Sequence, residues 1–202
     1  RTNSYLEAQF KDVRLYRCPA CDHCFTDISA LEKFETYDSD YYQKHHRNWN
    51  LNPLYPLFNF ILDQLDICYP PDKTLDILDV GCGRGHCLVY LQQTARKVSL
   101  TGIDLSDPPT AKGIKFIQGD FLTTEFAQTF DVVISLATIE HAVDVHEFTN
   151  RLIKACRPDG IIFLMTLDDR GILYELARKL NSIRIKAPFE RLYSRHHLNH
   201  FN

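Results

Sequence analysis

The chain has 202 residues, of which 45% are hydrophobic, and it carries a formal net charge of −3. This length and apolar content suit one compact domain with a small appendage, and the near-neutral charge argues against a nucleic-acid-binding protein, which would usually carry a basic surface. No apolar run reaches the roughly 20 residues that span a bilayer, and the polar start lacks the features of a signal peptide, so we expect a cytoplasmic protein without a membrane partner.

The N-terminal residues 1–36 contain short alternating runs around a cysteine cluster and predict a small β-rich appendage. Cys18 and Cys21 have the C-x-x-C spacing that lets two thiolates reach one tetrahedral zinc ion. A structural zinc site needs four ligands, so the others come either from a segment upstream or locally from His23 or Cys24; a metal-free knuckle is the remaining alternative. We expect zinc only when the upstream segment is present.

Residues 37–73 combine an aromatic stretch with a predicted amphipathic helix over 53–68, which the following Pro70 and Pro71 end. From residue 74 onward, apolar runs alternate with helical or turn segments, a pattern typical of buried parallel strands. This predicts a third segment, 74–202, with an α/β fold. The predicted strands are 75–80, 98–103, 114–118, 130–136 and 160–166.

The connections between these strands contain predicted helices over 85–95 and 145–156. Residues 157–160, which contain a proline and a glycine, are predicted to stop the second of these helices. Residues 106–113 are predicted to form a loop because they are few and contain two prolines. A last helix is predicted over 169–180.

A glycine-rich turn, Gly81-x-Gly83-x-Gly85, follows the first predicted buried strand and precedes a helix, where open α/β sheets bind ligands. Glycine lets the backbone approach a ligand closely, and the helix start offers unpaired N–H groups. Asp104 follows the second strand, about 20 residues later, as expected for a residue that binds a ribose diol. His86 stands where a dinucleotide fingerprint needs glycine, which disfavours a nicotinamide enzyme.

Further segments make residues 74–167 resemble a class I S-adenosylmethionine-dependent methyltransferase. Besides the glycine turn and Asp104, the similar segments are 118–121 after the third strand, 130–135 as the fourth strand, and 152–166 as the last crossover helix and strand. The resemblance implies a Rossmann-like fold with a parallel sheet. Members of this class usually end in an antiparallel hairpin, for which the chain has no room before Asn202, so we expect either a fragment or a curtailed sheet.

The resemblance also implies roles for individual residues in holding S-adenosylmethionine. Gly81 and Gly83 would pass beneath the methionine part, Asp79 would orient its ammonium group, Asp104 would hold the ribose hydroxyls, and Asp120 would accept from the adenine amino group. Each of these roles has an alternative. The glycine turn could serve only the packing of strand and helix, and Asp120 could be an ordinary loop carboxylate. The tyrosines of the aromatic segment, which include Tyr42, could serve only in packing. The implied cofactor-binding residues are Tyr42, Asp79, Gly81, Cys82, Gly83, Asp104, Leu105, Asp120, Phe121 and Leu136.

Glu140 and His141, just past the fourth strand, resemble the Glu-His motif of the ubiquinone-pathway and small-RNA O-methyltransferases. Some of these enzymes hold Mg²⁺ through two glutamates and histidines, but Ala137 stands at the position of the first glutamate, and a hard cation would lose that carboxylate. We therefore predict that His141 acts as a base or orients the acceptor, together with Glu140 and His197, and a structural role is the alternative. The neighbouring histidines at 196 and 200 fit a surface or helix-start role better.

Residues 13–25 also resemble the second half of the zinc ribbon that begins related sugar- and natural-product-pathway methyltransferases. Taken together, the resemblances imply methyl transfer from S-adenosylmethionine to a sugar-like, natural-product-like or quinone-like small molecule, with S-adenosylhomocysteine as product. The alternatives are a catalytically silent, cofactor-binding module that binds a partner through the cysteine knuckle, and a nicotinamide-dependent oxidoreductase. The sequence does not indicate an oligomeric state.

Overall fold

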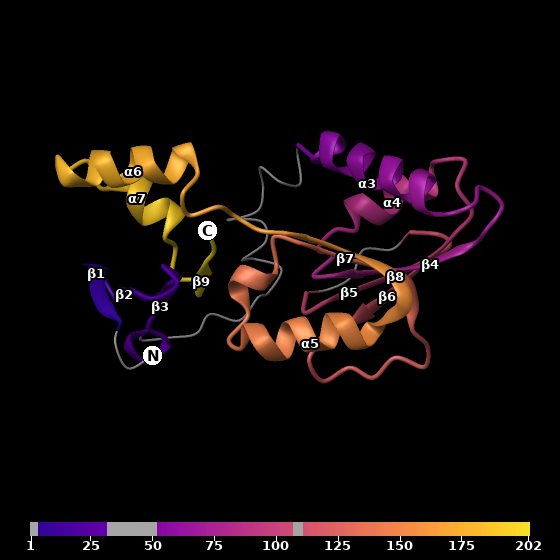
Figure 1. Ribbon diagram of the computed structural model, residues 1–202, viewed down its shortest axis with the longest axis horizontal. Coiled ribbons are helices and arrows are strands. Elements are labelled where there is room, and N and C mark those ends of the chain that lie inside the picture. The colour runs from indigo at the N-terminus through magenta and orange to yellow at the C-terminus, as the bar shows by residue number, and fades with distance from the viewer. Residues whose placement is uncertain (1–3, 32–51, 107–110) are drawn as a thin grey trace. The chain divides into compact units, whose positions relative to one another are not determined.

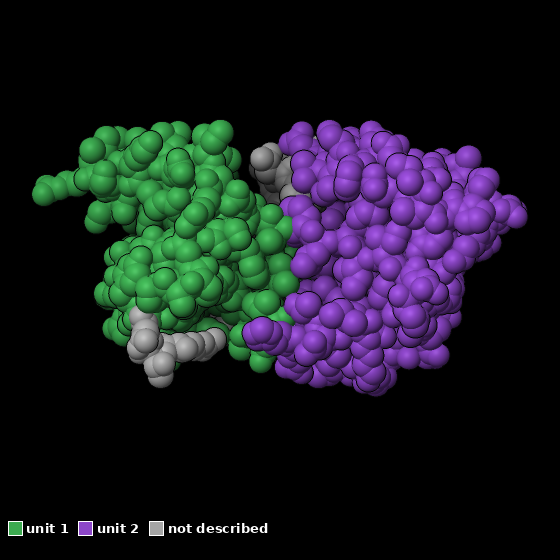
Figure 2. Space-filling model, viewed as in Figure 1, with its two compact units in different colours: residues 1–35, 137–145, 166–202 green, residues 36–136, 146–165 purple. Residues whose placement is uncertain are grey.

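The computed structural model describes residues 4–31, 52–106 and 111–202, and the chain forms two compact units (Figure 2). Unit 1 comprises residues 1–35, 137–145 and 166–202, and unit 2 comprises residues 36–136 and 146–165. The first boundary, after residue 35, lies one residue from the boundary at 36 that the sequence suggested. No unit boundary falls at 73, and residues 137–145 and 166–202 belong with the N-terminal residues. No helix in the described part of the chain is long and apolar enough to cross a membrane.

Unit 2 is built on a parallel sheet of five strands in the order β6-β5-β4-β7-β8. All five predicted strands are confirmed. The apolar runs of the three central strands β5, β4 and β7 are largely buried, as expected for parallel strands between helices, whereas the edge strands β6 and β8 are mostly half-buried. The register pairs Asp79 with Gly102, which brings the carboxyl ends of β4 and β5 together. The strands are β4 (Leu75–Val80), β5 (Val98–Asp104), β6 (Ile114–Gln118), β7 (Phe130–Leu136) and β8 (Cys156–Met165).

The start of β8 differs from the prediction. The segment 157–160 follows the end of α5 (Val145–Ala155), as predicted, but β8 begins at Cys156 and not at 160, so this segment belongs to the strand. Phe130 pairs with Cys156 and Val132 with Ile161, so the segment bulges out of the ladder and tolerates its proline. Arg157 holds the bulge, because its guanidinium nitrogens lie 2.8 Å from a carboxylate oxygen of Asp76 and 2.6 Å from a carboxylate oxygen of Asp131.

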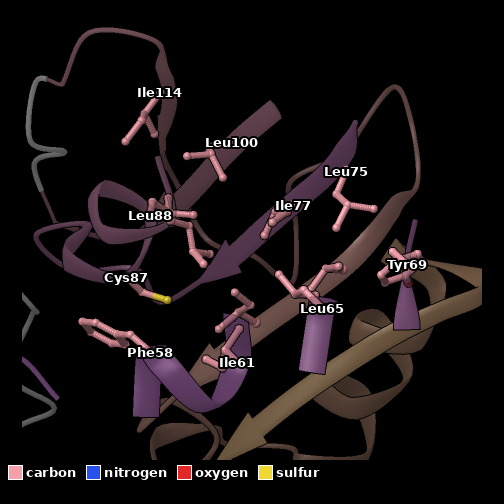
Figure 3. Packing of buried hydrophobic residues seen from close by; sticks show 13 residues of the cluster. Phe58, Ile61, Leu65, Tyr69, Leu75, Ile77, Cys87, Leu88, Leu100 and Ile114 are labelled. Carbon is pink, nitrogen blue, oxygen red and sulfur yellow. The ribbon is translucent and has the colours of Figure 1, made fainter. Parts of the chain in front are cut away.

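The core of unit 2 lies between the sheet and the two helices α3 (Tyr55–Cys68) and α4 (His86–Gln92), which cover one face, whereas α5 covers the other (Figure 1). Figure 3 shows apolar side chains from both helices packed on the strands. The helix predicted over 53–68 is confirmed, with a proline in its first turn where no intrahelical N–H is lost. The next helix is shorter than predicted. The buried cluster includes Phe58, Ile61, Leu65, Leu75, Ile77, Leu88, Leu100 and Ile134.

Unit 1 contains an antiparallel sheet in the order β1-β2-β3-β9, covered by two helices near the C-terminus. The predicted β-rich appendage is confirmed, but its fourth strand comes from the other end of the chain, which the sequence did not predict. Tyr174 and Ala177 of α6 pack with Val13 and Leu15 of β2. The elements are β1 (Tyr5–Phe10), β2 (Val13–Arg17), β3 (Cys24–Thr26), η1 (Ile28–Ala30), η2 (Ile139–His141), α6 (Ile172–Ser182), α7 (Ala187–Leu192) and β9 (Asn199–His200).

A buried ionic network joins the two ends of the chain within unit 1. The Arg17 guanidinium donates to a carboxylate oxygen of Glu7 at 2.6 Å and to one of Asp169 at 2.7 Å. Asp169 also accepts a hydrogen bond from the Tyr193 hydroxyl. These hydrogen bonds offset the cost of burying the charges, and they explain why residues 166–202 fold with the N-terminal strands.

Candidate functional site

The glycine turn between β4 and α4 has the backbone geometry that the sequence predicted. Gly81, Gly83 and Gly85 have φ values of 72°, 50° and 69°, in the left-handed region that side chains disfavour. The amides of Gly81 and Cys82 donate to the carbonyl of Ile103 at 2.9 and 3.2 Å, which fixes the turn on the end of β5. The backbone is therefore held without side chains in the way of a ligand.

Gly102 on β5 is a supporting residue that the sequence analysis missed. A Cβ atom at this position would lie 2.8 Å from the Sγ of Cys82, 2.9 Å from a methyl of Leu88 and 3.0 Å from the ring of Phe116. Only glycine lets β5 approach the turn this closely. The sequence carries one signal for this role, which is a lone glycine inside an apolar strand.

Asp104 ends β5 and is 5% exposed. One oxygen accepts from the Gly83 amide at 2.8 Å, and the other accepts from the amide and hydroxyl of Ser106 at 2.8 and 2.6 Å. The carboxylate therefore joins the glycine turn to the loop after β5. A ligand diol would add to these donors or replace some of them, and it would meet a carboxylate whose position is already fixed.

Asp79, one residue before the end of β4, is buried at 3% exposure. Burial, and then the negative charge of Asp104, raise the pKa of its carboxyl group to about 7. No hydrogen bond from the described part of the chain opposes this shift. Two carboxyl groups thus lie close enough to interact in a region that water hardly reaches, and a cationic ligand would favour the charged form of Asp79.

The other predicted cofactor-binding residues have mixed environments. Cys82 is half-buried, and burial raises the pKa of its thiol, so it is not a thiolate. Asp120 is exposed and accepts from the Leu122 amide at 2.9 Å. Leu105 is 51% exposed and the end of β7 at Leu136 is half-buried.

Phe121 is only 6% exposed, and its ring lies edge-on to that of Phe148 at 5.6 Å between centroids, so it packs into the protein. Tyr42 lies outside the described residues. The binding roles of Asp120, Phe121 and Tyr42 stay predictions.

The donor set beside the glycine turn fits S-adenosylmethionine. Two buried carboxyl groups match a ligand that carries an ammonium group and a ribose diol, and the turn beside them has glycines with left-handed φ values, which carry no Cβ atoms. In addition, the hydroxyl of Ser135 on β7 is buried with no hydrogen-bond partner among the described residues. An unpaired buried polar atom is uncommon without a function or a ligand.

The predicted catalytic residues Glu140, His141 and His197 are brought together in unit 1. Their ligand atoms all lie within 4.8 Å of one another, and the two imidazole rings are 5.1 Å apart between centroids. The Nδ1 of His141 lies 2.7 Å from the carbonyl of His196, and that of His197 lies 3.1 Å from the carbonyl of Leu192. Because carbonyls only accept, each Nδ1 carries a proton, so a further proton or a metal ion on either ring would bind at Nε2.

Glu140 is the buried member of this group, with 2% exposure. Its carboxyl group accepts a hydrogen bond from the Thr166 hydroxyl at 2.9 Å, a support that no sequence motif indicated. Burial raises its pKa, although the nearby charge of His197 acts in the opposite direction.

Two imidazoles with one carboxylate suit zinc or another transition metal better than Mg²⁺, which prefers oxygen ligands. Ala137, at the position of the missing glutamate, has a φ of 53° where the chain leaves β7.

The other two C-terminal histidines, His196 and His200, do not offer a ring nitrogen to the group formed by Glu140, His141 and His197. His200 is 3% exposed on β9, and burial lowers its pKa to about 3. It is therefore neutral at physiological pH and packs near the Tyr193 ring, 4.8 Å away between centroids. His196 supplies the carbonyl that orients His141.

The cysteine knuckle lies between β2 and β3. The Cys18 amide donates to the carbonyl of His23 at 3.0 Å, and hydrogen bonds from the backbone amides of Cys21 and Ala20 lower the pKa of the Cys18 thiol. Cys24 is fully buried in the core of unit 1, and burial raises the pKa of its thiol. No three-ligand metal group forms at the knuckle within the described residues. Zinc binding by Cys18 and Cys21 stays a prediction that requires ligands from elsewhere.

Comparison with known proteins gives consistent matches. Residues 42–202 match the sequence family described as a methyltransferase domain. A ubiquinone biosynthesis O-methyltransferase of Rickettsia bellii is 31% identical over 151 residues, which cover 69% of this chain and 62% of that protein. A malonyl-[acyl-carrier protein] O-methyltransferase of Acetivibrio thermocellus is 31% identical over 143 residues, covering 64% of this chain and 50% of that protein. The chain thus spans less than two thirds of the length of these two relatives.

A solved structure shows the same fold. The 1,6-didemethyltoxoflavin-N1-methyltransferase of Burkholderia thailandensis, with bound S-adenosylhomocysteine, aligns with a TM-score of 0.53 over 88% of this chain and 86% of its own. The sequence identity is 15%, so the likeness concerns the fold alone. It agrees with the Rossmann-like architecture of unit 2.

Proposed function

This chain belongs to the methyltransferase-domain family, and on that premise we propose that it transfers a methyl group from S-adenosylmethionine to a small-molecule acceptor. The observation that supports this most strongly is the pair of buried carboxyl groups, Asp79 and Asp104, beside the glycine turn at the ends of two adjacent strands.

In this proposal the glycine turn and the carboxylates near it each have one task in holding the cofactor. S-adenosylmethionine supplies, when bound, a methyl group on a positively charged sulfur. Asp104 accepts hydrogen bonds from the ribose hydroxyls, and Asp79, ionised by the ligand's positive charge, orients the ammonium group. Gly81 and Gly83 let the backbone lie against the ligand. Asp120 and its neighbours complete the adenine end.

We assign the acceptor's proton to His141. The acceptor hydroxyl loses its proton as its oxygen takes the methyl group, and the Nε2 of His141 receives that proton. The hydrogen bond from Nδ1 to the carbonyl of His196 orients the ring for this task. Glu140 adjoins the ring, and its carboxylate, when ionised, stabilises the charged form of His141. In the sequence, His141 follows the end of β7 by five residues.

The acceptor is proposed to react through oxygen, since the two curated relatives are both named as O-methyltransferases. Their names point to two acceptor classes, a phenol related to quinone precursors and a carboxylate on a malonyl thioester. We propose an acceptor from one of these classes. The single histidine base suits the phenol better, because a carboxylate has no proton to lose at neutral pH.

A methyl-transfer assay tests the proposal. The chain is incubated with methyl-labelled S-adenosylmethionine and either a catechol or a malonyl thioester, and the labelled product is measured for wild type, His141→Ala and the control His146→Ala. His146 is exposed on α5, so its loss should leave turnover unchanged. We expect His141→Ala to lower turnover by about 10²–10⁴-fold without changing the affinity for S-adenosylhomocysteine.

Three results would contradict this assignment. Transfer to neither acceptor class, with S-adenosylhomocysteine still bound, would favour the silent cofactor-binding module. Equal turnover of wild type and His141→Ala would give this histidine a structural role only. Loss of wild-type turnover after chelator treatment, restored by zinc, would instead make the three residues metal ligands.

A further inference from the structure

Helix α6 has a second apolar face that no described residue covers. Figure 1 shows α6 along the side of unit 1 that faces away from its sheet. Five large apolar side chains of α6 and the turn after it are strongly exposed: Ile172 at 86%, Leu173 at 70%, Ile183 at 65%, Leu176 at 51% and Ile185 at 49%.

The exposure of this face does not come from a loosely attached helix. Tyr174 and Ala177, at 4% and 1% exposure, hold the opposite side of α6 in the core of unit 1. Ile172, Leu176 and Ile183 follow helical spacing on the outward side. A surface helix normally carries polar residues there, so a helix that is apolar on both sides is expected to have a second apolar neighbour.

The charge around this face is strongly positive. The segment 171–192 contains five lysines and arginines against two glutamates, whereas the whole chain carries a net charge of −3. Lys179, Arg184 and Lys186 are exposed, and none of them forms an ion pair with any part of the chain that the structure describes. The apolar side chains are therefore bordered by basic groups available to an external anion.

We propose that this apolar face of α6, with its bordering basic residues, docks on an anionic lipid bilayer. A bilayer surface offers a negative charge and an apolar interior at once, which matches an interfacial helix with leucine and isoleucine on one face and lysine and arginine at its border. A second copy of the chain would bring like charges together across the same face. The sequence led us to expect no membrane partner, because no apolar run is long enough to span a bilayer. Docking on a bilayer surface needs no such run, so the proposal departs from that expectation.

A vesicle co-sedimentation experiment tests this docking, and it does not depend on the proposed methyl transfer. The chain is mixed with vesicles of equal parts phosphatidylglycerol and phosphatidylcholine, or of phosphatidylcholine alone. The first variant combines Ile172→Ser, Leu173→Ser and Ile183→Ser. The matched control combines Ile67→Ser and Ile153→Ser on α3 and α5, where the side chains are 74% and 58% exposed.

We expect wild type and control to bind the anionic vesicles, and the α6 variant to bind at least about tenfold more weakly. Replacing Lys179, Arg184 and Lys186 by glutamine should weaken binding roughly fivefold for each charge removed. Unchanged melting temperatures show that the variants fold, since the altered side chains are exposed. Wild-type binding no stronger to anionic than to neutral vesicles would overturn the proposal. So would a dimer that the α6 variant converts to a monomer, because a second copy would then cover the face.

Discussion

Two carboxyl groups of the same type lie in different surroundings at this site. Asp104 accepts three hydrogen bonds from the two loops beside it, so its oxygens are held in place before any ligand binds. Asp79 is buried without such donors, and its pKa is raised to about 7. The motif predicted both residues, but it could not reveal Ser106, which has no characteristic spacing and acts only through local loop geometry.

The raised pKa of Asp79 predicts a stability cost that depends on pH. The folded state holds the proton between the ordinary carboxyl pKa near 4 and about 7, so the free energy of unfolding falls as the pH rises through this range. Asp79→Asn removes the effect. We expect its melting temperature to match wild type near pH 4 and to exceed it at pH 8, by roughly 2–4 °C for each kcal/mol of burial cost relieved.

Binding should show the opposite trend in the same protein. Wild-type affinity for S-adenosylmethionine should increase as the pH rises through 7, because the ligand's ammonium group requires the ionised carboxylate. Asp79→Asn should bind weakly at every pH. A melting temperature of Asp79→Asn that stays below wild type at pH 8 would mean that the Asp79 carboxyl group stabilises the free protein, contrary to this account.

At the level of elements, apolar runs predicted the strands because the central strands of a parallel sheet are buried between helices. Strand β8 begins four residues earlier than predicted, because the segment 157–160, whose proline and glycine ended the preceding helix as predicted, joins the strand as a bulge held by Asp76 and Asp131. Strand β9 was missed for another reason. Its pairing joins Cys24 to His200, and two residues carry too little periodicity to be recognised.

The packing of β5 against the glycine turn predicts a specific sensitivity at Gly102. Gly102→Ala would place a Cβ atom 2.8 Å from the Sγ of Cys82, and overpacking of this kind typically costs about 1–3 kcal/mol. We expect a lower melting temperature and weaker binding of S-adenosylhomocysteine, because the turn has to shift. Gly119→Ala is the control for stability, since its Cβ would meet only the Thr124 hydroxyl at 3.1 Å. Equal melting temperatures of the two variants would contradict tight packing under the turn.

For the molecule as a whole, the sequence predicted the α/β fold, because the motifs lie directly after strands. The cofactor-binding roles that it assigned to individual residues stay predictions. It placed the unit boundaries differently, because contacts such as those of Arg17 with Asp169 join residues 152 positions apart. Local patterns do not contain such pairings. The grouping of Glu140, His141 and His197 likewise depends on the C-terminal segment, although the family resemblance had selected all three.

The measurement that tests the central claim most directly is calorimetric titration of wild type with S-adenosylhomocysteine and with NADH, repeated for Asp104→Ala and Ser106→Ala. Wild type should bind S-adenosylhomocysteine and not NADH. Charge-assisted hydrogen bonds of about 1.5–3 kcal/mol each predict that Asp104→Ala raises the dissociation constant by roughly 10-fold to more than 100-fold. Ser106→Ala keeps the carboxylate, so its effect should be a few-fold at most, with both variants checked for folding by their melting temperatures. Binding of NADH but not of S-adenosylhomocysteine by wild type would contradict the assignment.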